Sequence, residues 1–359
     1  MVVPDETKYE KLQDLLKAEL SSGKFRTGDR FYTEREIMEK YSVSGITVAR
    51  ALNEMTKKGY FKRKRKLGTF VLESPEMPGM TGCVMTRPLF INRATHEESD
   101  ETRNGPSWFV VEEIRRGVIN SYPGAVKIVD MDEIVAEAEK DSELLAVLLP
   151  QHIAYYEEKY AFSKPARSIE IVLPPNVGKE FNCVRPNYLI GVYEAMEHLI
   201  RHGHTRIAFL GRRELRNRYA AYRIALETYG LPFYPELTLF DRNAVSVEVG
   251  ALLIRQLLAL PSPPSAVFCG TDKLAIGAMQ TLRELKVKVP EEISIVGFDD
   301  ISAASTCEIP LSTVHVPYFE LGKAAVGLLF KRMKSGGDVP SKTLMTNYVM
   351  RQTTAEYHG

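Results

Sequence analysis

The sequence predicts an α/β protein in which a small winged helix-turn-helix head precedes a larger, two-lobed body of doubly wound parallel sheets. Three observations lead to this prediction. Residues 1–73 hold three helical patterns and a hairpin, a proline-containing segment follows, and the remainder alternates short apolar runs with amphipathic helices. Such alternation is typical of parallel sheets flanked by helices. A chain of 359 residues is long enough for two to three folding units.

Charge is divided unevenly along the chain, although the formal net charge is only +1. Residues 1–75 hold 16 Lys and Arg against 11 Asp and Glu, a net of +5, and the other 284 residues carry −4. A basic head on an acidic body indicates a nucleic-acid-binding module joined to another domain. Residues 1–11 lack the apolar stretch of a signal peptide, and no apolar run could span a bilayer. We therefore expect a cytoplasmic, nucleoid-associated protein with no membrane partner.

The head begins with a predicted helix over residues 8–22. Thr33 opens a second helix, and Glu36 three residues later completes a capping box. Ser44 caps a third helix that begins at Gly45 and ends near Lys58. The side chains expected to face the core of the head recur at helical spacing. They are Tyr9, Leu12, Leu15, Leu16, Leu20, Ile37, Met38, Tyr41, Val48, Leu52 and Met55.

A short hairpin follows the third helix and carries five consecutive cations at residues 62–66. Each cation that meets a DNA phosphate releases a counterion, which gives affinity that does not depend on sequence and weakens with salt. A solvated charge run is the alternative interpretation. The position of the run on a hairpin directly after a helix-turn-helix pattern favours a DNA-binding wing.

The stretch TEREIMEKYSVSGITVARALNEMTKKGYFKRKRKLGTFV carries a family resemblance. Glu-Arg-Glu opens the second helix, Val-Ser-x-x-Thr-Val-x-x-Ala-Leu lies on the third, and Gly-Thr-Phe-Val closes the hairpin. Residues 9–71 thereby resemble the winged helix-turn-helix of the GntR family, which implies that the third helix enters the major groove of operator DNA. The DNA-binding residues that the resemblance and the basic wing predict are Arg35, Ser44, Thr47, Arg50, Arg63, Lys64, Arg65, Lys66, Gly68 and Thr69.

Two positions depart from the family's pattern. Gly45 stands where many members have an arginine after Val-Ser, and Ala49 stands where many have one after Thr-Val. Either arginine could recognise guanine through two hydrogen bonds, so the operator sequence does not follow from the resemblance. Arg50 and the basic wing could compensate in affinity, but phosphate contacts position a protein without specifying sequence.

Residues 74–79 (SPEMPG) predict an interdomain linker, because two prolines and a glycine fall between patterned regions. We divide the chain into a DNA-binding domain of residues 1–73, a linker of residues 74–80 and a body of residues 81–359. The strands expected in the body lie at 82–86, 125–131, 144–149, 167–173, 206–210, 237–240, 266–269, 293–298 and 348–351. The helices expected there lie at 107–121, 132–140, 189–202, 218–229, 247–260, 274–285 and 319–334.

Four stretches of the body carry a second resemblance: 198–211 (HLIRHGHTRIAFLG), 217–222 (NRYAAY), 266–301 and 311–329. They look like the effector-binding domain of the LacI family, which is similar to periplasmic sugar-binding proteins. The resemblance implies a two-lobed, periplasmic-binding-protein-like body that binds a small ligand and forms a dimer. Head and body together resemble the chimeric arabinose-type repressors.

The resemblance places the effector site at specific residues of this chain. Arg218 lies in NRYAAY and Asp299 in GFDD. Thr271-Asp272 replaces the family's Asn-Asp, and Asn187-Tyr188 replaces its Asp-Asn. An arginine with carboxylates suits vicinal hydroxyl groups, and an aromatic side chain at the rim of the cleft suits the apolar face of a sugar ring. The expected effector-binding residues are Trp108, Asn187, Tyr188, Arg218, Thr271, Asp272 and Asp299.

Each of these features also has a structural interpretation. His198 and His202 stand four residues apart with His204 nearby, a spacing that could bind a metal, but no cysteine or carboxylate partner accompanies them. Adjacent carboxylates at Asp299 and Asp300 point to opposite sides of a strand, which disfavours a shared catalytic site. Arg218 could form a surface ion pair, and Trp108 could belong to the core. We expect Cys83, Cys183, Cys269 and Cys307 to be buried thiols without zinc or disulfides.

We therefore predict a DNA-binding transcriptional regulator, a repressor, whose operator affinity is controlled by a small ligand, most simply a sugar. Its expected partners are double-stranded operator DNA, the effector and a second copy in a homodimer. No metal, cofactor or catalytic residue is expected, because no phosphate-binding, nucleophile-elbow or zinc-protease motif occurs. The alternatives are a sugar-binding protein or a sugar-acting enzyme without a DNA role.

Overall fold

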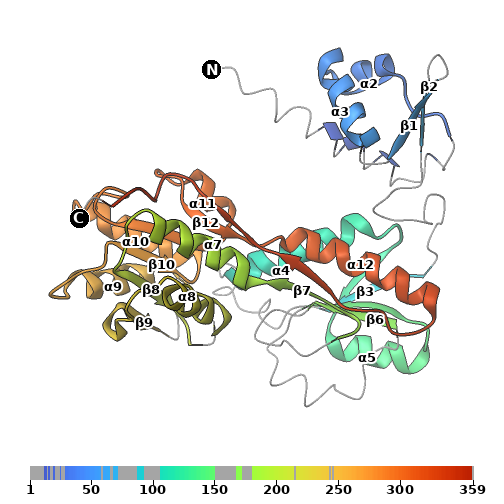
Figure 1. Ribbon diagram of the computed structural model, residues 1–359. Helices are drawn as coiled ribbons and strands as arrows, with labels where there is room; N and C mark the ends of the chain where they lie inside the picture. The colour runs from blue at the N-terminus through green and yellow to red at the C-terminus, as the bar shows by residue number, and fades with distance from the viewer. Residues whose placement is uncertain are drawn as a thin grey trace. The chain divides into compact units, whose positions relative to one another are not determined.

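The computed structural model divides into two compact units, Met1–Leu89 with Asn120–Lys127, and Phe90–Ile119 with Ile128–Gly359 (Figure 1). At residues 57, 62–64, 92 and 106–108 the backbone alone is described. The described residues are 12–13, 15–16, 19–20, 25, 29–57, 60–64, 68–71, 87–92, 106–149, 167–171, 180–213, 216–241, 244 and 246–357. The predicted linker and the predicted strand at 82–86 lie outside them.

Two helices of the head form the predicted helix-turn-helix: α2 (Glu34–Tyr41) and α3 (Gly45–Lys57). Leu15 and Met38 were wrongly assigned to the core, because they are 48% and 38% exposed. Leu15 lies beside the buried stripe of the first helix, and Met38 lies against Gly45, where no side chain covers it. The expected core residues that are buried are Leu12, Leu16, Ile37, Val48, Leu52 and Met55.

The wing is an antiparallel hairpin of β1 (Phe61–Lys64) and β2 (Gly68–Val71). A segment before α2 adds a further edge to it. The amide of Phe31 donates to the carbonyl of Thr69 at 2.8 Å, and the amide of Val71 donates to the carbonyl of Asp29 at 2.9 Å. This connection, which the sequence did not indicate, fixes the wing against the start of α2.

The body contains two six-stranded sheets, which define its N-lobe and C-lobe. The N-lobe sheet has the order β13-β7-β6-β5-β3-β4, and the C-lobe sheet has the order β14-β12-β11-β10-β8-β9. Between the described strands of the body, β14 pairs antiparallel with β12, and β10–β11, β10–β8, β11–β12, β13–β7, β5–β6, β6–β7 and β8–β9 pair parallel. The N-lobe strands are β3 (Leu89–Asn92), β4 (Val126–Val129), β5 (Leu145–Leu148), β6 (Arg167–Ile171), β7 (Cys183–Asn187) and β13 (Lys342–Met345). The C-lobe strands are β8 (Ile207–Gly211), β9 (Thr238–Phe240), β10 (Ala266–Cys269), β11 (Ser294–Asp299), β12 (Ser312–His315) and β14 (Asn347–Val349).

Helices flank both sheets, as the predicted doubly wound architecture requires (Figure 1). The described helices are α4 (Pro106–Ser121), α5 (Met131–Lys140), α7 (Tyr188–Arg201), α8 (Arg216–Thr228), α9 (Val247–Leu258), α10 (Asp272–Glu284), α11 (Ser302–Thr306) and α12 (Tyr318–Ser335), with a 3₁₀ turn at Pro235–Leu237. In the N-lobe α12 packs on β6, and its Gly322 touches the backbone of α4 at Ile114. The close contact at Gly322 places α4 beside the first turns of α12.

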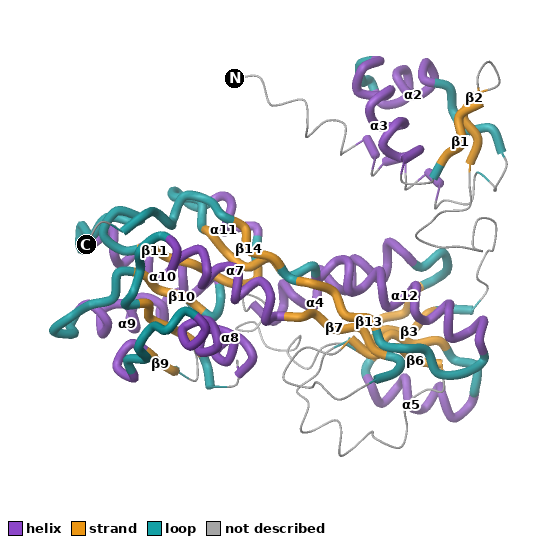
Figure 2. Tube along the Cα trace, viewed as in Figure 1, coloured by secondary structure: helices purple, strands orange, loops and turns teal. Residues whose placement is uncertain are grey.

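The chain crosses between the two lobes three times: from β7 into α7, from β12 into α12, and from β13 into β14 (Figure 2). The buried hydroxyl of Thr346 joins two of these crossings. It donates to the carbonyl of Asn187 at 2.7 Å and accepts from the amide of Gly191 at 3.0 Å. We name these three crossing segments the hinge.

Most of the predicted body strands and all of its predicted helices are present, within two residues of the expected bounds. Four strands were missed: β3, β7, β12 and β13. β7 contains an arginine and a proline, β12 is polar although buried, and β13 is an exposed edge. These three strands lack the apolar run that identified the other strands, whereas β3 carries one and was missed all the same.

Candidate functional site

The helix-turn-helix presents its predicted DNA-binding residues unequally. Arg35 extends from the first turn of α2 with its side chain 88% exposed, and its Nε donates to Glu39 at 2.9 Å. Thr33 and Glu36 form the predicted capping box, so the start of α2 is fixed. Arg50 is exposed on α3. Both arginines can therefore reach a nucleic acid.

Ser44 and Thr47 form one polar unit at the start of α3. The Ser44 hydroxyl accepts from the Thr47 amide at 3.3 Å and lies 2.8 Å from the Thr47 hydroxyl. Thr47 is only 5% exposed, whereas Ser44 is exposed. Of these two residues, Ser44 is therefore the one that DNA can reach, and the contact with Thr47 holds its side chain in place. Ile46, which the sequence analysis did not select, is 79% exposed beside them.

The wing residues are described in part. Gly68 has φ +115°, and a Cβ there would lie 2.9 Å from Nε of Arg30. Both facts require glycine at this position. Thr69 is buried and contributes its carbonyl to the sheet. For Arg63 and Lys64 the strand is described without the side chains, and Arg65 and Lys66 lie outside the described residues.

The predicted effector residues Arg218 and Asp299 meet in the body as a buried ion pair. Nη2 of Arg218 lies 3.3 Å from Oδ1 of Asp299, and the two side chains are 8% and 3% exposed. Nη1 of Arg218 donates to the carbonyl of Gly270, and the Tyr318 hydroxyl donates to Oδ1 of Asp299 at 2.7 Å. The surface-ion-pair interpretation of Arg218 is therefore wrong.

Two aromatic rings enclose the guanidinium of this pair. Cζ of Arg218 lies 3.7 Å from the centroid of the Phe298 ring and 5.2 Å from that of Tyr188. The two rings meet edge to face at 5.1 Å. Tyr188 begins α7 and Tyr318 begins α12, so the pair contacts two segments of the hinge. Phe298 and Tyr318 were not among the predicted site residues.

Burial is the largest single influence on the pKa of each group in this cluster. It raises the pKa of Asp299 above its ordinary value, against the opposing effect of Arg218 and Tyr318. Burial lowers the pKa of Arg218, but the charge of Asp299 and the neighbouring phenols outweigh it, so the net shift is upward. Burial also raises the pKa of the Tyr188 and Tyr318 phenols, which therefore stay neutral and can donate hydrogen bonds.

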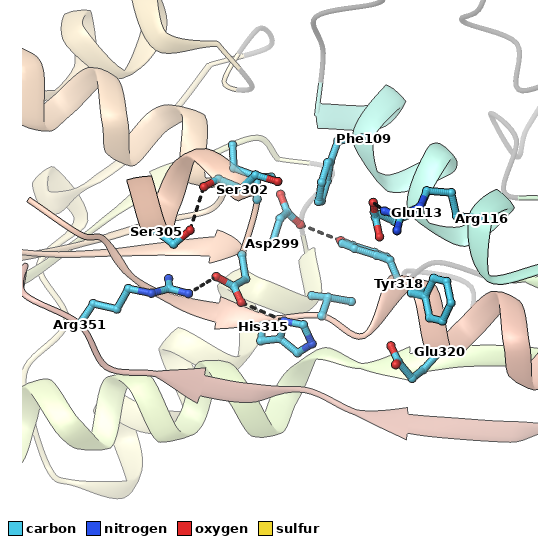
Figure 3. A pocket seen from close by; sticks show the side chains of 14 residues that line it. Phe109, Glu113, Arg116, Asp299, Ser302, Ser305, His315, Tyr318, Glu320 and Arg351 are labelled. Atoms are coloured by element: carbon cyan, nitrogen blue, oxygen red, sulfur yellow. Dashed lines mark hydrogen bonds and ion pairs between the residues drawn. The ribbon is translucent and has the colours of Figure 1, made fainter. Parts of the chain in front are cut away.

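A cavity of ≈ 320 Å³ opens beside Asp299 and Tyr318 (Figure 3). Phe109, Glu113 and Arg116 of α4 line its opposite wall. Its volume falls within the range of small-molecule sites. Its walls carry carboxylates, hydroxyls and a few aromatic rings, which suits a polar ligand with several hydrogen-bonding groups.

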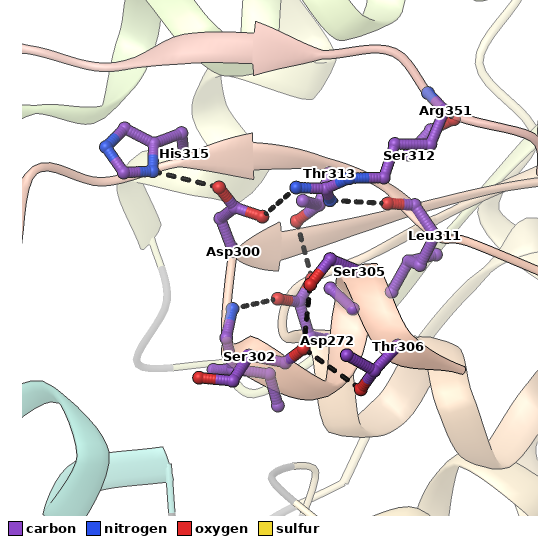
Figure 4. A network of polar contacts seen from close by, with 12 residues as sticks. Asp272, Asp300, Ser302, Ser305, Thr306, Leu311, Ser312, Thr313, His315 and Arg351 are labelled. Atoms are coloured by element: carbon purple, nitrogen blue, oxygen red, sulfur yellow. Dashed lines mark hydrogen bonds and ion pairs between the residues drawn. The ribbon is translucent and has the colours of Figure 1, made fainter. Parts of the chain in front are cut away.

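Asp300 also lines this cavity, but its carboxylate belongs to a separate network of polar contacts (Figure 4). Its carboxylate lies 3.0 Å from Nδ1 of His315 and accepts from Nη2 of Arg351 at 2.6 Å. Burial raises the pKa of Asp300, but these two partners outweigh it, so the net pKa is lowered. Asp299 and Asp300 have φ +107° and +55°, unusual for non-glycine residues. The turn directs the two carboxylates into different networks, in agreement with the structural interpretation of the pair.

Three other predicted effector residues, Asp272, Thr271 and Asn187, serve local structure here. Both carboxylate oxygens of Asp272 are used inside the C-lobe, one by the Thr313 hydroxyl at 2.5 Å and one by the Ile301 amide at 2.8 Å. Thr271 caps α10 and Asn187 caps α7 through their side chains. Trp108 lies on α4, but its side chain is outside the described part. These four remain predictions for ligand binding.

The histidine cluster makes contacts that explain it without a metal. Nε2 of His198 lies 3.2 Å from the Thr354 hydroxyl, and His204 contacts Ser265 and the carbonyl of Ala355. Burial lowers the pKa of His198 to about 4. Within the described segments, no group of three or more His, Cys, Asp and Glu could hold a metal ion. The helices described there include none long and apolar enough to cross a membrane.

Comparison with known families supports both parts of this architecture. Residues 8–71 match the family described as bacterial regulatory proteins, gntR family, and residues 196–354 match the periplasmic binding protein-like domain. The chain joins a GntR-type head to a periplasmic-binding-protein-like body. Both predicted resemblances and the predicted fold class are thereby confirmed.

Two repressors of Escherichia coli K12 resemble this chain. The HTH-type transcriptional repressor CytR is 35% identical over 159 residues, 43% of this chain and 46% of CytR. The ribose operon repressor is 35% identical over 179 residues, 48% of this chain and 53% of that protein. The chain thus matches about half the length of these curated relatives.

Solved structures extend the likeness across the body. A LacI family transcriptional regulator from Enterococcus faecium with bound ribose superposes with a TM-score of 0.60 at 21% identity, covering 75% of this chain and 99% of that one. The Escherichia coli transcriptional repressor ascG gives 0.60 at 23% identity, over 75% and 100%. At this identity the likeness shows a shared fold.

Proposed function

We propose that the protein is a transcriptional repressor whose operator binding is controlled by a sugar bound in the body. One observation carries the proposal: a helix-turn-helix with exposed Arg35 and Arg50 shares a chain with a two-lobed body in which Asp299, paired with buried Arg218, lines a cavity. CytR and the ribose operon repressor, which this chain resembles, are repressors, and this disfavours the sugar-acting enzyme and the pure sugar-binding protein.

The effector proposed for the cavity is a monosaccharide of the pentose class. Oδ1 of Asp299 already accepts hydrogen bonds from Arg218 and Tyr318, while the carboxylate lines the cavity. A charged acceptor held by two donors can bind sugar hydroxyls without reorganising. The cavity of ≈ 320 Å³ is of monosaccharide size, and a ribose operon repressor and a ribose-bound regulator are among the similar proteins.

The hinge provides the proposed coupling between sugar and DNA. Tyr188 and Tyr318 begin α7 and α12 directly after two hinge crossings, and both surround the Arg218–Asp299 pair. A sugar that binds this pair more tightly in one arrangement of the lobes shifts the population toward that arrangement. We further propose that the protein binds its operator as a homodimer, so the shift alters the spacing of two heads.

Two titrations test the proposal. The single tryptophan, Trp108, allows sugar binding to be followed by fluorescence across a panel of pentoses, hexoses and sugar acids. DNA binding is measured by anisotropy on the protein's own upstream region at low salt, with and without the sugar, while sedimentation gives the oligomeric state. We expect one pentose to bind and to change DNA affinity at least tenfold. Absence of DNA binding, or a bound sugar without effect on it, would refute the proposal.

A further inference from the structure

The surface of α3 carries an apolar side chain where a DNA-binding helix usually carries polar ones. Ile46 is 79% exposed, more than any other large hydrophobic residue among those described. Two small residues are close to it in the sequence: Gly45 directly precedes it, and Ala49 follows one turn later on the same face of α3. Ile46 therefore projects from α3 without lateral cover.

Cations frame this apolar projection. Arg50 lies four residues after Ile46, so both occupy the same face of α3. Arg35 and the exposed Met38 belong to α2, and Met38 Sδ lies 3.4 Å from where a Cβ of Gly45 would be. The exposed surface of the helix-turn-helix thus has an apolar centre with arginines around it. Such a surface fits a polyanion that offers an apolar group in its groove.

One apolar group in the major groove of B-DNA is suited to this centre: the 5-methyl group of thymine. The two positions that could carry guanine-reading arginines hold Gly45 and Ala49, which cannot donate side-chain hydrogen bonds. We propose that Ile46 contacts a thymine methyl group in each operator half-site and is a specificity-determining residue of this protein. The inference rests on the proposed DNA-binding function.

The experiment removes the methyl group from the DNA. Duplexes are first selected from a random pool by the full-length wild-type protein. In the tightest of them each thymine is then replaced by uracil, one position at a time, and affinity is measured by anisotropy. We expect one or two positions per half-site at which uracil weakens wild-type binding about fourfold, the factor that corresponds to ~0.8 kcal/mol for one buried methyl group.

Variants assign that effect to Ile46. The Ile46→Ala protein should bind the thymine and uracil duplexes equally at those positions, and Ile46→Val should retain most of the difference. Ile224→Ala is the matched control, because Ile224 is 48% exposed on α8 of the body and should leave the wild-type pattern intact. Thermal unfolding confirms that each variant is folded.

Two other results overturn the inference. Uracil replacement that weakens wild type and Ile46→Ala by the same factor, or that weakens neither, would show that Ile46 reads no methyl group. Failure of the wild type to enrich any duplex would instead refute the DNA-binding function, and this inference with it.

Discussion

The buried pair of Arg218 and Asp299 allows a quantitative prediction of stability. Asp299→Asn removes the negative charge but keeps the size of the side chain. The guanidinium of Arg218 then stays in a site where it is only 8% exposed, facing two aromatic rings and one carbonyl. Breaking a buried ion pair on one side typically costs about 3–5 kcal/mol, because an uncompensated charge is left inside.

This cost translates into a measurable melting shift. A domain of this size loses roughly 2–4 °C of Tm for each kcal/mol, so Asp299→Asn should melt about 6–20 °C below wild type. The assay is calorimetry at neutral pH. The matched control is Glu308→Gln, which breaks the exposed pair of Arg283 and Glu308, whose side chains are 67% and 70% exposed. Exposed pairs contribute about 0–1 kcal/mol, so this control should melt within a few degrees of wild type.

A double variant tests the physical reason. Arg218→Met combined with Asp299→Asn leaves no net charge in the buried site, so its Tm should lie at or above that of Asp299→Asn alone. A single variant that melts within 2 °C of wild type would refute the assignment of a tightly buried pair. Additive losses in the double variant would show that the two side chains do not act on one another.

The remaining predictions concern the histidine cluster, the wing and the hinge. Because the pKa of His198 is about 4 in the folded protein and near 6.5 in the unfolded chain, the free energy of unfolding should fall as the pH drops from 6.5 to 4. The loss is at most ~3 kcal/mol, and solvent screening of this half-buried ring reduces it to the order of 1 kcal/mol. Calorimetry across this pH range should show a shallower fall for His198→Gln. An alanine at position 68 would be strained at φ +115°, and its Cβ would collide with the side chain of Arg30. Gly68→Ala should therefore weaken DNA binding and destabilise the head by about 1–2 kcal/mol, while sugar binding, followed by fluorescence, stays unchanged. Thr346→Val leaves the buried amide of Gly191 without its acceptor and should cost about 1–3 kcal/mol in urea unfolding; an unchanged midpoint would show that the hydroxyl does not join the hinge segments.

The fold could be predicted to the extent that local pattern decides it. α10 was found because its apolar positions repeat with the period of a helix. β10 was found because it is a continuous apolar run, which the structure buries. β12 was missed because Ser312 and Thr313 are fully buried yet polar. Their environment comes from tertiary contacts, such as the Thr353 hydroxyl that accepts from the Ser312 amide at 2.9 Å. No window of sequence contains that information.

The candidate site shows the same division. Arg218 and Asp299 were predicted from short motifs, and they meet although 81 positions separate them. Tyr318 was passed over because it stands just before the helix predicted at 319–334 and carries no motif of its own, and only the folded hinge brings its hydroxyl to Asp299. Ile46 was assigned neither to the core nor to the DNA-binding residues, and its high exposure became evident only from the structure.

The energetics of the hinge set a minimum for what the effector must do. Reversing a 99:1 preference between two lobe arrangements requires about 10⁴-fold, or ~5.5 kcal/mol, of differential binding. A hydrogen bond to a charged group contributes about 1.5–3 kcal/mol, so two to four such bonds must differ between the arrangements. Asp299, which lines the cavity, can supply acceptors for such bonds. An effector that engaged the C-lobe groups alone would bind both arrangements equally, so effective ligands must also contact the α4 wall of the cavity, where Phe109, Glu113 and Arg116 lie.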